Sequence, residues 1–263
     1  MIIDTVTSKN DLKKMFKRLG MKREHDVFVH SSMKSLGYVV NGANDVIDAL
    51  LETVGENGTI LMPAHTGQLT DPRGWLHPFV PSKFVSKVRK NMKPLCQSTT
   101  IRNRGIVAQT FLTYDSVWRS CHPLNSVIAV GLNSDCFTCE HNLDDSEGVS
   151  SPIFKLYEAQ GYVLLIGVDL TKCTAIHLAE YLADVPYLYE TKIRVLYNGK
   201  FVKLNKYPNG SEHFNKVRKE AEVKKYFKEI KTAKGVMTYF PIKPVIDFIV
   251  NKLKDNPKYL VTA

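Results

Sequence analysis

The stretch DVFVHSSMKSLGYVVNGANDVIDALLETVGENGTILMP, residues 26–63, contains two short apolar runs with an amphipathic segment between them. Residues 26–30 and 58–63 are rich in Val, Ile and Leu, which is typical of buried strands. Residues 43–54 place apolar side chains at helical spacing and stop at Gly55, a residue type that commonly follows a helix. A strand, a helix and a strand in this order predict a crossover between two parallel strands.

Segments on both sides continue this alternation. We expect a helix over residues 12–19, strands at 126–130 and 162–168, helices at 152–160, 173–182 and 241–253, and a hairpin formed by 191–197 and 201–204. The predicted strands lack polar–apolar alternation, so helices should cover both faces of the sheet. The chain has 263 residues, of which 44% are hydrophobic. It therefore predicts a single α/β domain over residues 1–263, with a mixed central sheet sandwiched by helices.

Composition excludes several classes of protein. No apolar run reaches the ~18–20 residues that a membrane span needs, and the first residues lack the apolar core of a signal peptide. We therefore expect a cytoplasmic protein with no membrane partner. The five cysteines are odd in number and sparse, so they form no disulfide framework. Cys136 and Cys139 make one Cys-x-x-Cys pair, but the second ligand pair of a zinc site is missing, and no metal is expected.

The net charge of +10 is concentrated near the C-terminal end. Residues 191–263 hold 17 Lys/Arg and 6 Asp/Glu, a net charge of +11, whereas residues 1–190 hold 19 and 20, a net charge of −1. A lysine-rich, solvated helix face would explain this segment, and so would an attraction for phosphorylated ligands. No RNA-recognition motif, zinc-finger spacing or glycine-arginine tract accompanies the charge, so no nucleic-acid partner is expected.

Polar clusters stand at the ends of several predicted strands, where α/β proteins place their ligands. In chain order they are His30-Ser31-Ser32 with Ser35-Leu36-Gly37, Met62 to Thr66 with Asp71 and Trp75, Arg104-Gly105, Cys121-His122-Pro123 with Ser126, Ser151-Pro152, and the segment HLAE at residues 177–180. His177 and Glu180 are three residues apart, so a helix presents them on one face. Histidine, with an unperturbed pKa near ~6.5, is a suitable general base at neutral pH.

In their order and spacing these clusters resemble the aminoglycoside 3-N-acetyltransferase family, also called the antibiotic N-acetyltransferase family. The similar text comprises residues 29–75, the run RSCHPLNSVIAVG at 119–131, and residues 151–181. The resemblance implies a mixed α/β fold distinct from the more common acetyltransferase fold. It also implies acetyl-coenzyme A as the donor, an amine on a sugar-like ring as the acceptor, and direct transfer without an acyl-enzyme.

The resemblance further implies roles for individual residues. His177 matches the family's catalytic histidine, and Glu180 matches a carboxylate on the acceptor side, where we also expect Asp71. A later acidic position of the family falls on Glu222, which we expect to orient the His177 ring. The donor is expected to contact the first strand end, the turn after it and the Arg-Gly pair, namely Ser31, Ser32, Ser35, Leu36, Gly37, Arg104 and Gly105.

Three departures from the family pattern leave the acceptor open. The family's Gly-Glu-Gly-Ser-Pro run is GVSSP at residues 148–152, with Glu147 shifted by one position. The small residues after the Arg-Gly pair become Ile106 and Val107, and the C-terminal third is basic. Aminoglycosides carry several positive charges, which a basic segment repels unless local carboxylates dominate the pocket. We therefore expect the acceptor to be an aminoglycoside, a nucleotide-linked amino sugar, an amino sugar of a surface polysaccharide or another small amine.

Two other classes of protein stay open at this point. A non-catalytic relative would use the basic segment to bind a polyanionic partner, and a thiol enzyme would use Cys121 beside His122. The sequence is also compatible with a homodimer.

Overall fold

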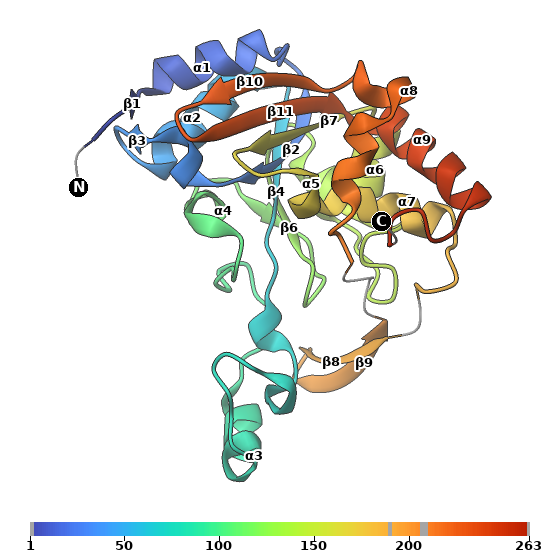
Figure 1. The fold of residues 1–263 in the computed structure, drawn as a ribbon. Coiled ribbons are helices and arrows are strands. Elements are labelled where there is room, and N and C mark those ends of the chain that lie inside the picture. Colours follow the sequence, from blue (N-terminus) through green and yellow to red (C-terminus); the bar gives the residue numbers. More distant parts are fainter. Residues whose placement is uncertain (1–2, 189–190, 206–209, 262–263) are drawn as a thin grey trace.

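The computed structural model describes residues 3–188, 191–205 and 210–261. In these ranges the chain forms the following helices and strands (Figure 1): β1 (Val6–Thr7), α1 (Lys9–Arg18), β2 (Asp26–Ser31), β3 (Tyr38–Val39), α2 (Ala43–Val54), β4 (Thr59–Pro63), α3 (Ser82–Asn91), α4 (Gly105–Phe111), β5 (Trp118–Arg119), β6 (Val127–Gly131), α5 (Ser134–Thr138), α6 (Pro152–Glu158), β7 (Tyr162–Ile166), α7 (His177–Leu182), β8 (Lys192–Tyr197), β9 (Lys200–Asn205), α8 (Ala221–Lys224), β10 (Lys228–Thr232), β11 (Gly235–Pro241) and α9 (Ile242–Asp255).

The centre of the fold is a seven-stranded mixed sheet with the strand order β10-β11-β7-β2-β4-β6-β5. β2 lies in the middle and runs parallel to β4 and β7, with Asp26 opposite Thr59 and Val27 opposite Tyr162. β11 and β6 flank this parallel core in antiparallel orientation. The predicted crossover over residues 26–63 is confirmed. The carboxyl ends of β2, β4 and β7 meet at one edge of the sheet as a consequence.

Helices cover both faces of this sheet (Figure 1). Along β2, Val27 and Val29 pack in one hydrophobic cluster with residues of α1, α2 and α4. Phe28 points the other way, into a cluster with residues of α5, α6, α7 and α9. Successive side chains of a strand alternate between the two faces of the sheet. Because both faces are buried here, the strands show no alternation of polar and apolar residues. The predicted mixed sheet sandwiched by helices is confirmed.

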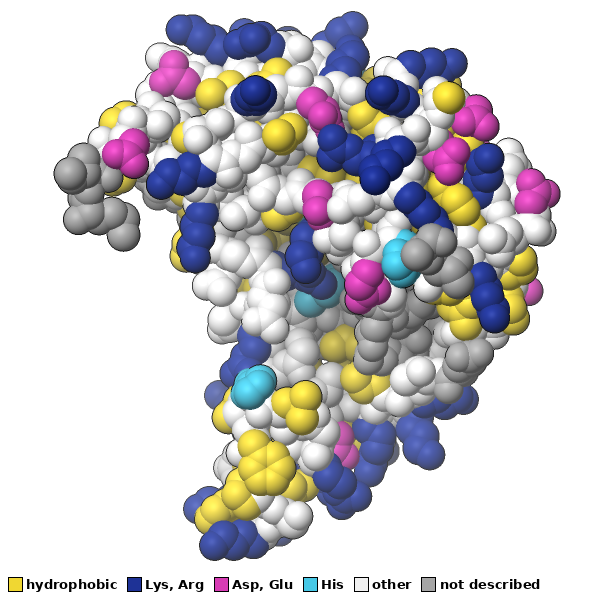
Figure 2. All heavy atoms as spheres, viewed as in Figure 1, with side chains coloured by type: hydrophobic (Ala, Val, Ile, Leu, Met, Phe, Trp, Pro, Cys, Tyr) yellow, Lys and Arg dark blue, Asp and Glu magenta, His cyan; other side chains and the backbone are white. Residues whose placement is uncertain are grey.

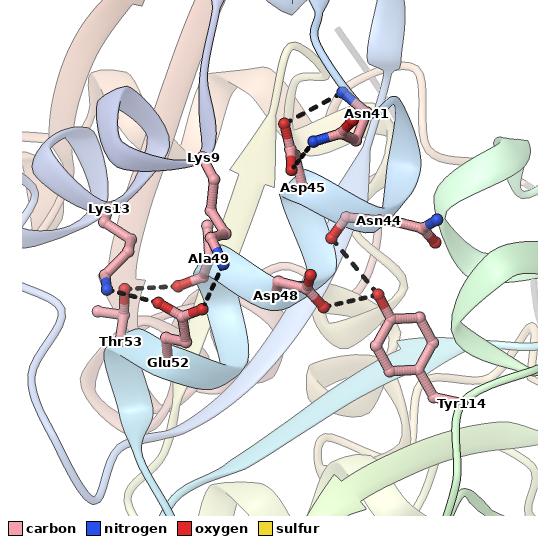
Figure 3. A network of polar contacts seen from close by, with 10 residues as sticks. All are labelled: Lys9, Lys13, Asn41, Asn44, Asp45, Asp48, Ala49, Glu52, Thr53 and Tyr114. Atoms are coloured by element: carbon pink, nitrogen blue, oxygen red, sulfur yellow. Dashed lines mark hydrogen bonds and ion pairs between the residues drawn. The ribbon is translucent and has the colours of Figure 1, made fainter.

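Polar contacts hold α2 in place against its neighbours (Figure 3). Glu52 accepts a hydrogen bond from Lys9 Nζ at 2.7 Å and another from Lys13 Nζ at 2.5 Å, both on or beside α1. In the first turn of α2, Asp45 accepts hydrogen bonds from the backbone and the side-chain amide of Asn41. A negative charge at this end is favoured by the helix dipole. These contacts orient the crossover helix relative to α1.

A projection extends away from the sheet and carries α3 together with the β8–β9 hairpin (Figure 1). The antiparallel pairing of β8 with β9 confirms the predicted hairpin. The projection has its own small hydrophobic cluster, formed by Leu69, Val195 and Leu204. An ion pair at 2.6 Å joins Arg89 of α3 to Asp71 in the loop that precedes this helix. The projection thus brings residues 67–77 next to the hairpin.

The basic C-terminal segment differs from expectation. A lysine-rich helix face would explain the charge of this segment, but the described residues from 214 to 232 form a 3₁₀ turn, the four-residue α8 and the strand β10. The next strand, β11, pairs with β7 and extends the central sheet. Met237 and Tyr239 enter one hydrophobic cluster and Phe240 the other. The two-residue period of a strand therefore governs this segment.

Gly131 marks a close approach between β6 and β4. Its φ is +134°, and a Cβ atom there would lie 2.1 Å from the carbonyl oxygen of Gly58. We expect Gly131→Ala to lower the free energy of unfolding by about 2 kcal/mol or more, because sterics and backbone conformation both oppose a side chain. Gly74→Ala, where a Cβ meets nothing within 4 Å, should change it by less than about 0.5 kcal/mol. Urea unfolding compares them, and equal midpoints would refute the prediction.

Candidate active site

Two adjoining pockets open where the strands of the parallel core end, and Figure 2 shows the molecule hollowed between the body and the projection. The first, which we call the Ser31 pocket, has a volume of about 170 Å³ and is lined by Val29, His30, Ser31, Met62, Pro63, Asn103, Arg104, Gly105, Ala108, Val168 and Lys172. The second, the Trp75 pocket, has a volume of about 370 Å³ and is lined by His65, Gly67, Gln68, Thr70, Trp75, Leu76, His77, Arg102, Asn103, Arg104, Leu124, Asn125 and Ile193. Asn103 and Arg104 belong to both, so one wall separates the two pockets.

Burial and the Arg104 charge both disfavour protonation of the histidines around this shared wall. Nη2 of Arg104 donates a hydrogen bond to Nδ1 of His65. Because a guanidinium only donates, His65 is neutral and carries its proton on Nε2. Burial, reinforced by the Arg104 charge, holds the pKa of His65 well below its ordinary value. The same two causes lower the pKa of His30 to about 3. Both imidazole rings therefore line the pockets in their neutral form and are poor proton acceptors.

His177 and Glu180 form a buried pair on α7. Nδ1 of His177 lies 2.6 Å from Oε2 of Glu180, and the glutamate side chain is fully buried. The hydroxyl of Tyr187 donates to the other carboxylate oxygen at 3.0 Å, and the Phe214 ring packs edge-on against the imidazole. With the Nδ1 proton directed at Glu180, a neutral ring carries its lone pair on Nε2. This arrangement suits a general base held in one orientation.

The segment that leads into α7 connects the pair to the Ser31 pocket. Val168 and Lys172 line that pocket, and Thr174 Oγ1 lies 3.5 Å from Nε2 of His30 on its wall. His177 follows Thr174 by three residues, about one helical turn. The base is thus positioned by the same segment that walls the pocket.

Two predicted carboxylates lie elsewhere than expected. Glu222 does not orient His177: it stands on α8 with its side chain 59% exposed and pairs with Lys252 at 3.7 Å. Glu180 takes that place, because residues three apart share a helix face, and its burial removes it from the acceptor side. Asp71 does not face an acceptor freely either. Its carboxylate accepts two hydrogen bonds from Arg89 Nη2 and one from the Arg73 amide.

The seven residues expected at the donor divide into two groups. The first group, Ser31, Arg104 and Gly105, lines the Ser31 pocket as a set. The others shape the turn behind it. The backbone N–H of Ser32 donates to Ile166, and the buried hydroxyl of Ser35 donates to the Ser32 carbonyl. Leu36 is buried in the hydrophobic core, and Gly37 has a φ of +75° that favours glycine.

The Cys121-His122 pair does not form a thiol–base couple. Both ring nitrogens of His122 contact the backbone: Nδ1 accepts from the N–H groups of Leu124 and Asn125, and Nε2 donates to the Leu143 carbonyl. Burial lowers the pKa of His122 to about 4. His122 therefore holds its loop, and a thiol enzyme at this position is not supported.

A buried polar network behind the Trp75 pocket was not predicted as a whole. Arg119 donates to the carbonyls of Gln97 and Ala64 and to the hydroxyl of Ser126. The signal in the sequence was the dense polar run at residues 119–126, of which only part was singled out. By joining residue 64 to residue 97, Arg119 ties the end of β4 to the loop that precedes α4.

Glu147, the acidic residue shifted by one position from the family run, is a further functional candidate. It is 1% exposed, and Nδ2 of Asn125, a residue of the Trp75 pocket, donates to its Oε1 at 2.9 Å. Burial raises its pKa to about 8 despite that hydrogen bond and the nearby Arg104 charge. The acidic residue missing from the family run is therefore represented, one position away, by a carboxyl that is mostly protonated at neutral pH.

This titration gives Glu147 a measurable effect on stability. Its folded-state pKa lies above the ordinary value of 4.5, so its contribution is complete at low pH and is lost as the pH rises toward about 8. Glu147→Gln removes the titration while its amide oxygen still accepts from Asn125. We expect the variant to lose less free energy of unfolding than the wild type between about pH 5 and pH 8. Urea unfolding at several pH values tests this, and parallel pH profiles would contradict it.

Among the described residues, the structure shows neither a candidate metal site nor a candidate membrane span. Within residues 3–188, 191–205 and 210–261, no three His, Cys, Asp or Glu side chains gather as metal ligands. No helix in those ranges is long and apolar enough to cross a bilayer.

Comparison with known proteins identifies the family. A sequence model described as aminoglycoside 3-N-acetyltransferase matches residues 28–254. The aminoglycoside N(3')-acetyltransferase-like protein YokD of Bacillus subtilis is 38% identical over 191 residues, covering 71% of this chain and 70% of YokD. Aminoglycoside N(3)-acetyltransferase III of Pseudomonas aeruginosa is 31% identical over 172 residues, 65% of this chain but only 62% of that relative, which is less than two thirds of its length.

Solved structures agree with this result. The crystal structure of YokD superposes with a TM-score of 0.83 at 31% identity, covering 97% of this chain and 96% of that one. The structure of AAC-IIIb in binary form with CoASH shares the fold, with a TM-score of 0.82 at 24% identity over 98% of this chain and 100% of that one. The fold, the motifs and the extent of the match together show that this chain belongs to the aminoglycoside 3-N-acetyltransferase family of N-acetyltransferases.

Proposed function

We propose that this enzyme transfers an acetyl group from acetyl-coenzyme A to an amine of an amino sugar, with His177 as the general base. The observation that carries the proposal is the buried contact between His177 Nδ1 and Glu180 Oε2 at 2.6 Å, on the segment that walls the Ser31 pocket. A histidine oriented by a carboxylate is the arrangement that accepts a proton and stabilises the resulting imidazolium.

The chemistry requires such a base because an ammonium group has no lone pair with which to attack a thioester. The acceptor ammonium first loses one proton to solvent. As the resulting neutral amine nitrogen bonds to the acetyl carbon, Nε2 of His177 removes a second proton from that nitrogen. The tetrahedral intermediate then collapses, the carbon–sulfur bond breaks, and the His177 imidazolium returns this proton to the sulfur, which leaves as the coenzyme A thiol. The products are the acetamide and coenzyme A, and no covalent enzyme intermediate is formed. General-base catalysis of this kind contributes ~10²–10⁴-fold.

The Ser31 pocket supplies suitable groups for the donor. The Ser31 hydroxyl and the Arg104 guanidinium can donate to carbonyl and phosphate oxygens. Gly105, with a φ of +78°, leaves the backbone open to close approach. The name of the AAC-IIIb complex with CoASH supports a coenzyme A donor for this fold. A cytoplasmic location belongs to the same proposal.

Thiol release from acetyl-coenzyme A tests the proposal. The full-length enzyme is incubated with acetyl-coenzyme A and an aminoglycoside such as sisomicin or a simple amino sugar, and the product is identified by mass spectrometry. We expect a mass increase of one acetyl group on the acceptor and no acetylated protein in its absence. Failure of coenzyme A to bind at all would overturn the proposal. Salt-dependent binding of polyanions instead would favour a non-catalytic role.

A further inference from the structure

The Trp75 pocket has an unusual charge for an enzyme whose relatives are named for polycationic substrates. Among the described residues that line it, the titratable ones are Arg102, Arg104, His65 and His77, and none is Asp or Glu. Two guanidinium groups in one pocket attract phosphate and carboxylate oxygens, which a planar fork of N–H donors matches well. The same groups repel ammonium ions.

Asp71 and Glu147, two carboxylates in contact with residues of this region, do not offset that charge. Asp71 is paired with Arg89 at 2.6 Å and with Arg194 at 3.6 Å. Glu147 is buried behind Asn125 and is held largely in its neutral form, since burial raises its pKa to about 8. Pairing with arginine thus neutralises Asp71, and protonation largely neutralises Glu147. Neither carboxylate offers a free negative charge to an amine.

Unpaired polar atoms indicate what the pocket is built to hold. Gln68 Oε1, Asn125 Oδ1 and Arg104 Nε are buried and have no hydrogen-bond partner among the described residues, and all three residues line the pocket. Buried polar atoms without a partner are rare in folded proteins, so a ligand or water is expected to satisfy them. The two amide oxygens accept from hydroxyl groups, whereas the guanidinium N–H needs an acceptor, best an anionic one.

The side chain of Arg102 is available for the same ligand. It is exposed and lines the pocket, and it forms no ion pair within the described ranges. Its own backbone is fixed, because its N–H donates to the His65 carbonyl at 2.9 Å. Arg102 and Arg104 therefore stand on one short, anchored segment with two guanidinium groups facing one cavity.

We propose that the acceptor carries a phosphate or carboxylate group in addition to its amine, and that Arg102 binds this group in the Trp75 pocket, assisted by Arg104 from the wall shared with the Ser31 pocket. The hydroxyl groups of a sugar satisfy Gln68 and Asn125, so a phosphorylated or nucleotide-linked amino sugar has the required chemistry. This inference rests on the proposed acetyl transfer. A phosphate of coenzyme A has the same chemistry, and the test separates the two sources.

The experiment compares acetylation of glucosamine 1-phosphate, glucosamine and sisomicin by the wild-type enzyme and two variants. We expect kcat/KM for glucosamine 1-phosphate to exceed that for glucosamine by at least about 10-fold, the effect of one favourable charged hydrogen bond. Arg102→Gln should reduce this ratio severalfold toward one. Arg18→Gln, which removes the same charge from the last turn of α1, should leave the ratio unchanged.

Binding of coenzyme A distinguishes the source of the anion. By isothermal titration, Arg102→Gln should bind coenzyme A with the wild-type dissociation constant if the arginine serves the acceptor. If Arg102→Gln raised the dissociation constant of coenzyme A but left the ratio of kcat/KM for glucosamine 1-phosphate and glucosamine unchanged, the arginine would bind a donor phosphate. That result would overturn the inference. Preference for sisomicin over glucosamine 1-phosphate would also overturn it while leaving the proposed function intact. If none of the three acceptors caused thiol release and coenzyme A did not bind, the proposed function itself would be refuted.

Discussion

His177→Ala is expected to lower kcat for acetyl transfer by at least about 100-fold, because it removes the group that accepts the amine proton. The loss should appear in kcat and kcat/KM alike, since a general base acts in the transition state rather than in substrate binding. The dissociation constant of coenzyme A should stay within about twofold of the wild-type value, as His177 is not among the residues that line the Ser31 pocket. Steady-state kinetics and isothermal titration measure the two quantities.

A control separates loss of the base from loss of structure. His177 is 4% exposed and packs against Phe214, so alanine also leaves a small cavity that can lower stability. His177→Asn fills more of that space and still cannot act as a base. If His177→Asn retained more than about a tenth of the wild-type kcat, the general-base assignment would be wrong.

Glu180→Gln is expected to lower kcat by about 100-fold while leaving the fold in place. The substitution keeps the shape of the side chain but removes the charge that stabilises the imidazolium, and its amide no longer fixes the His177 tautomer. The Tyr187 hydroxyl can still donate to the amide oxygen at this position. Thermal unfolding should therefore change little, whereas the pH dependence of kcat/KM should change shape along with its magnitude.

Tyr187→Phe provides the matched control for Glu180. It deletes the other hydrogen bond to the same carboxylate, at 3.0 Å, without changing any charge. Burial and the Glu180 charge raise the pKa of Tyr187 above its ordinary value, so the hydroxyl remains a donor. We expect Tyr187→Phe to reduce kcat by less than about 10-fold, the effect of one neutral hydrogen bond. Equal effects of Glu180→Gln and Tyr187→Phe would show that Glu180 acts only through packing.

Local sequence patterns were sufficient to predict much of the fold and the shared helix face of His177 and Glu180. The apolar runs at residues 26–30 and 58–63 and the helical spacing at 43–54 predicted the parallel core. The three-residue spacing of His177 and Glu180 predicted that they share a helix face. Contacts between neighbours in the chain follow from helix and strand geometry alone, so the sequence displays them directly.

Contacts between distant segments could not be obtained in that way. From the sequence, Glu222 was expected at the His177 ring and Glu180 on the acceptor side, and only the packing of α7 and α8 shows that Glu180 is buried and Glu222 exposed. Asp71 was expected on the acceptor side, but α3 brings Arg89 against it. No strand was predicted at residues 235–241, and pairing with β7 makes them the strand β11.

The sequence by itself therefore determined the α/β class, the order of the parallel core and the family. The tertiary structure alone decided which carboxylates keep a free charge. Burial and pairing set that property. Burial raises the pKa of Glu147, Arg89 pairs with Asp71, and His177 contacts Glu180. Desolvation and pairing energies depend on atoms brought together from distant parts of the chain, so no local pattern encodes them.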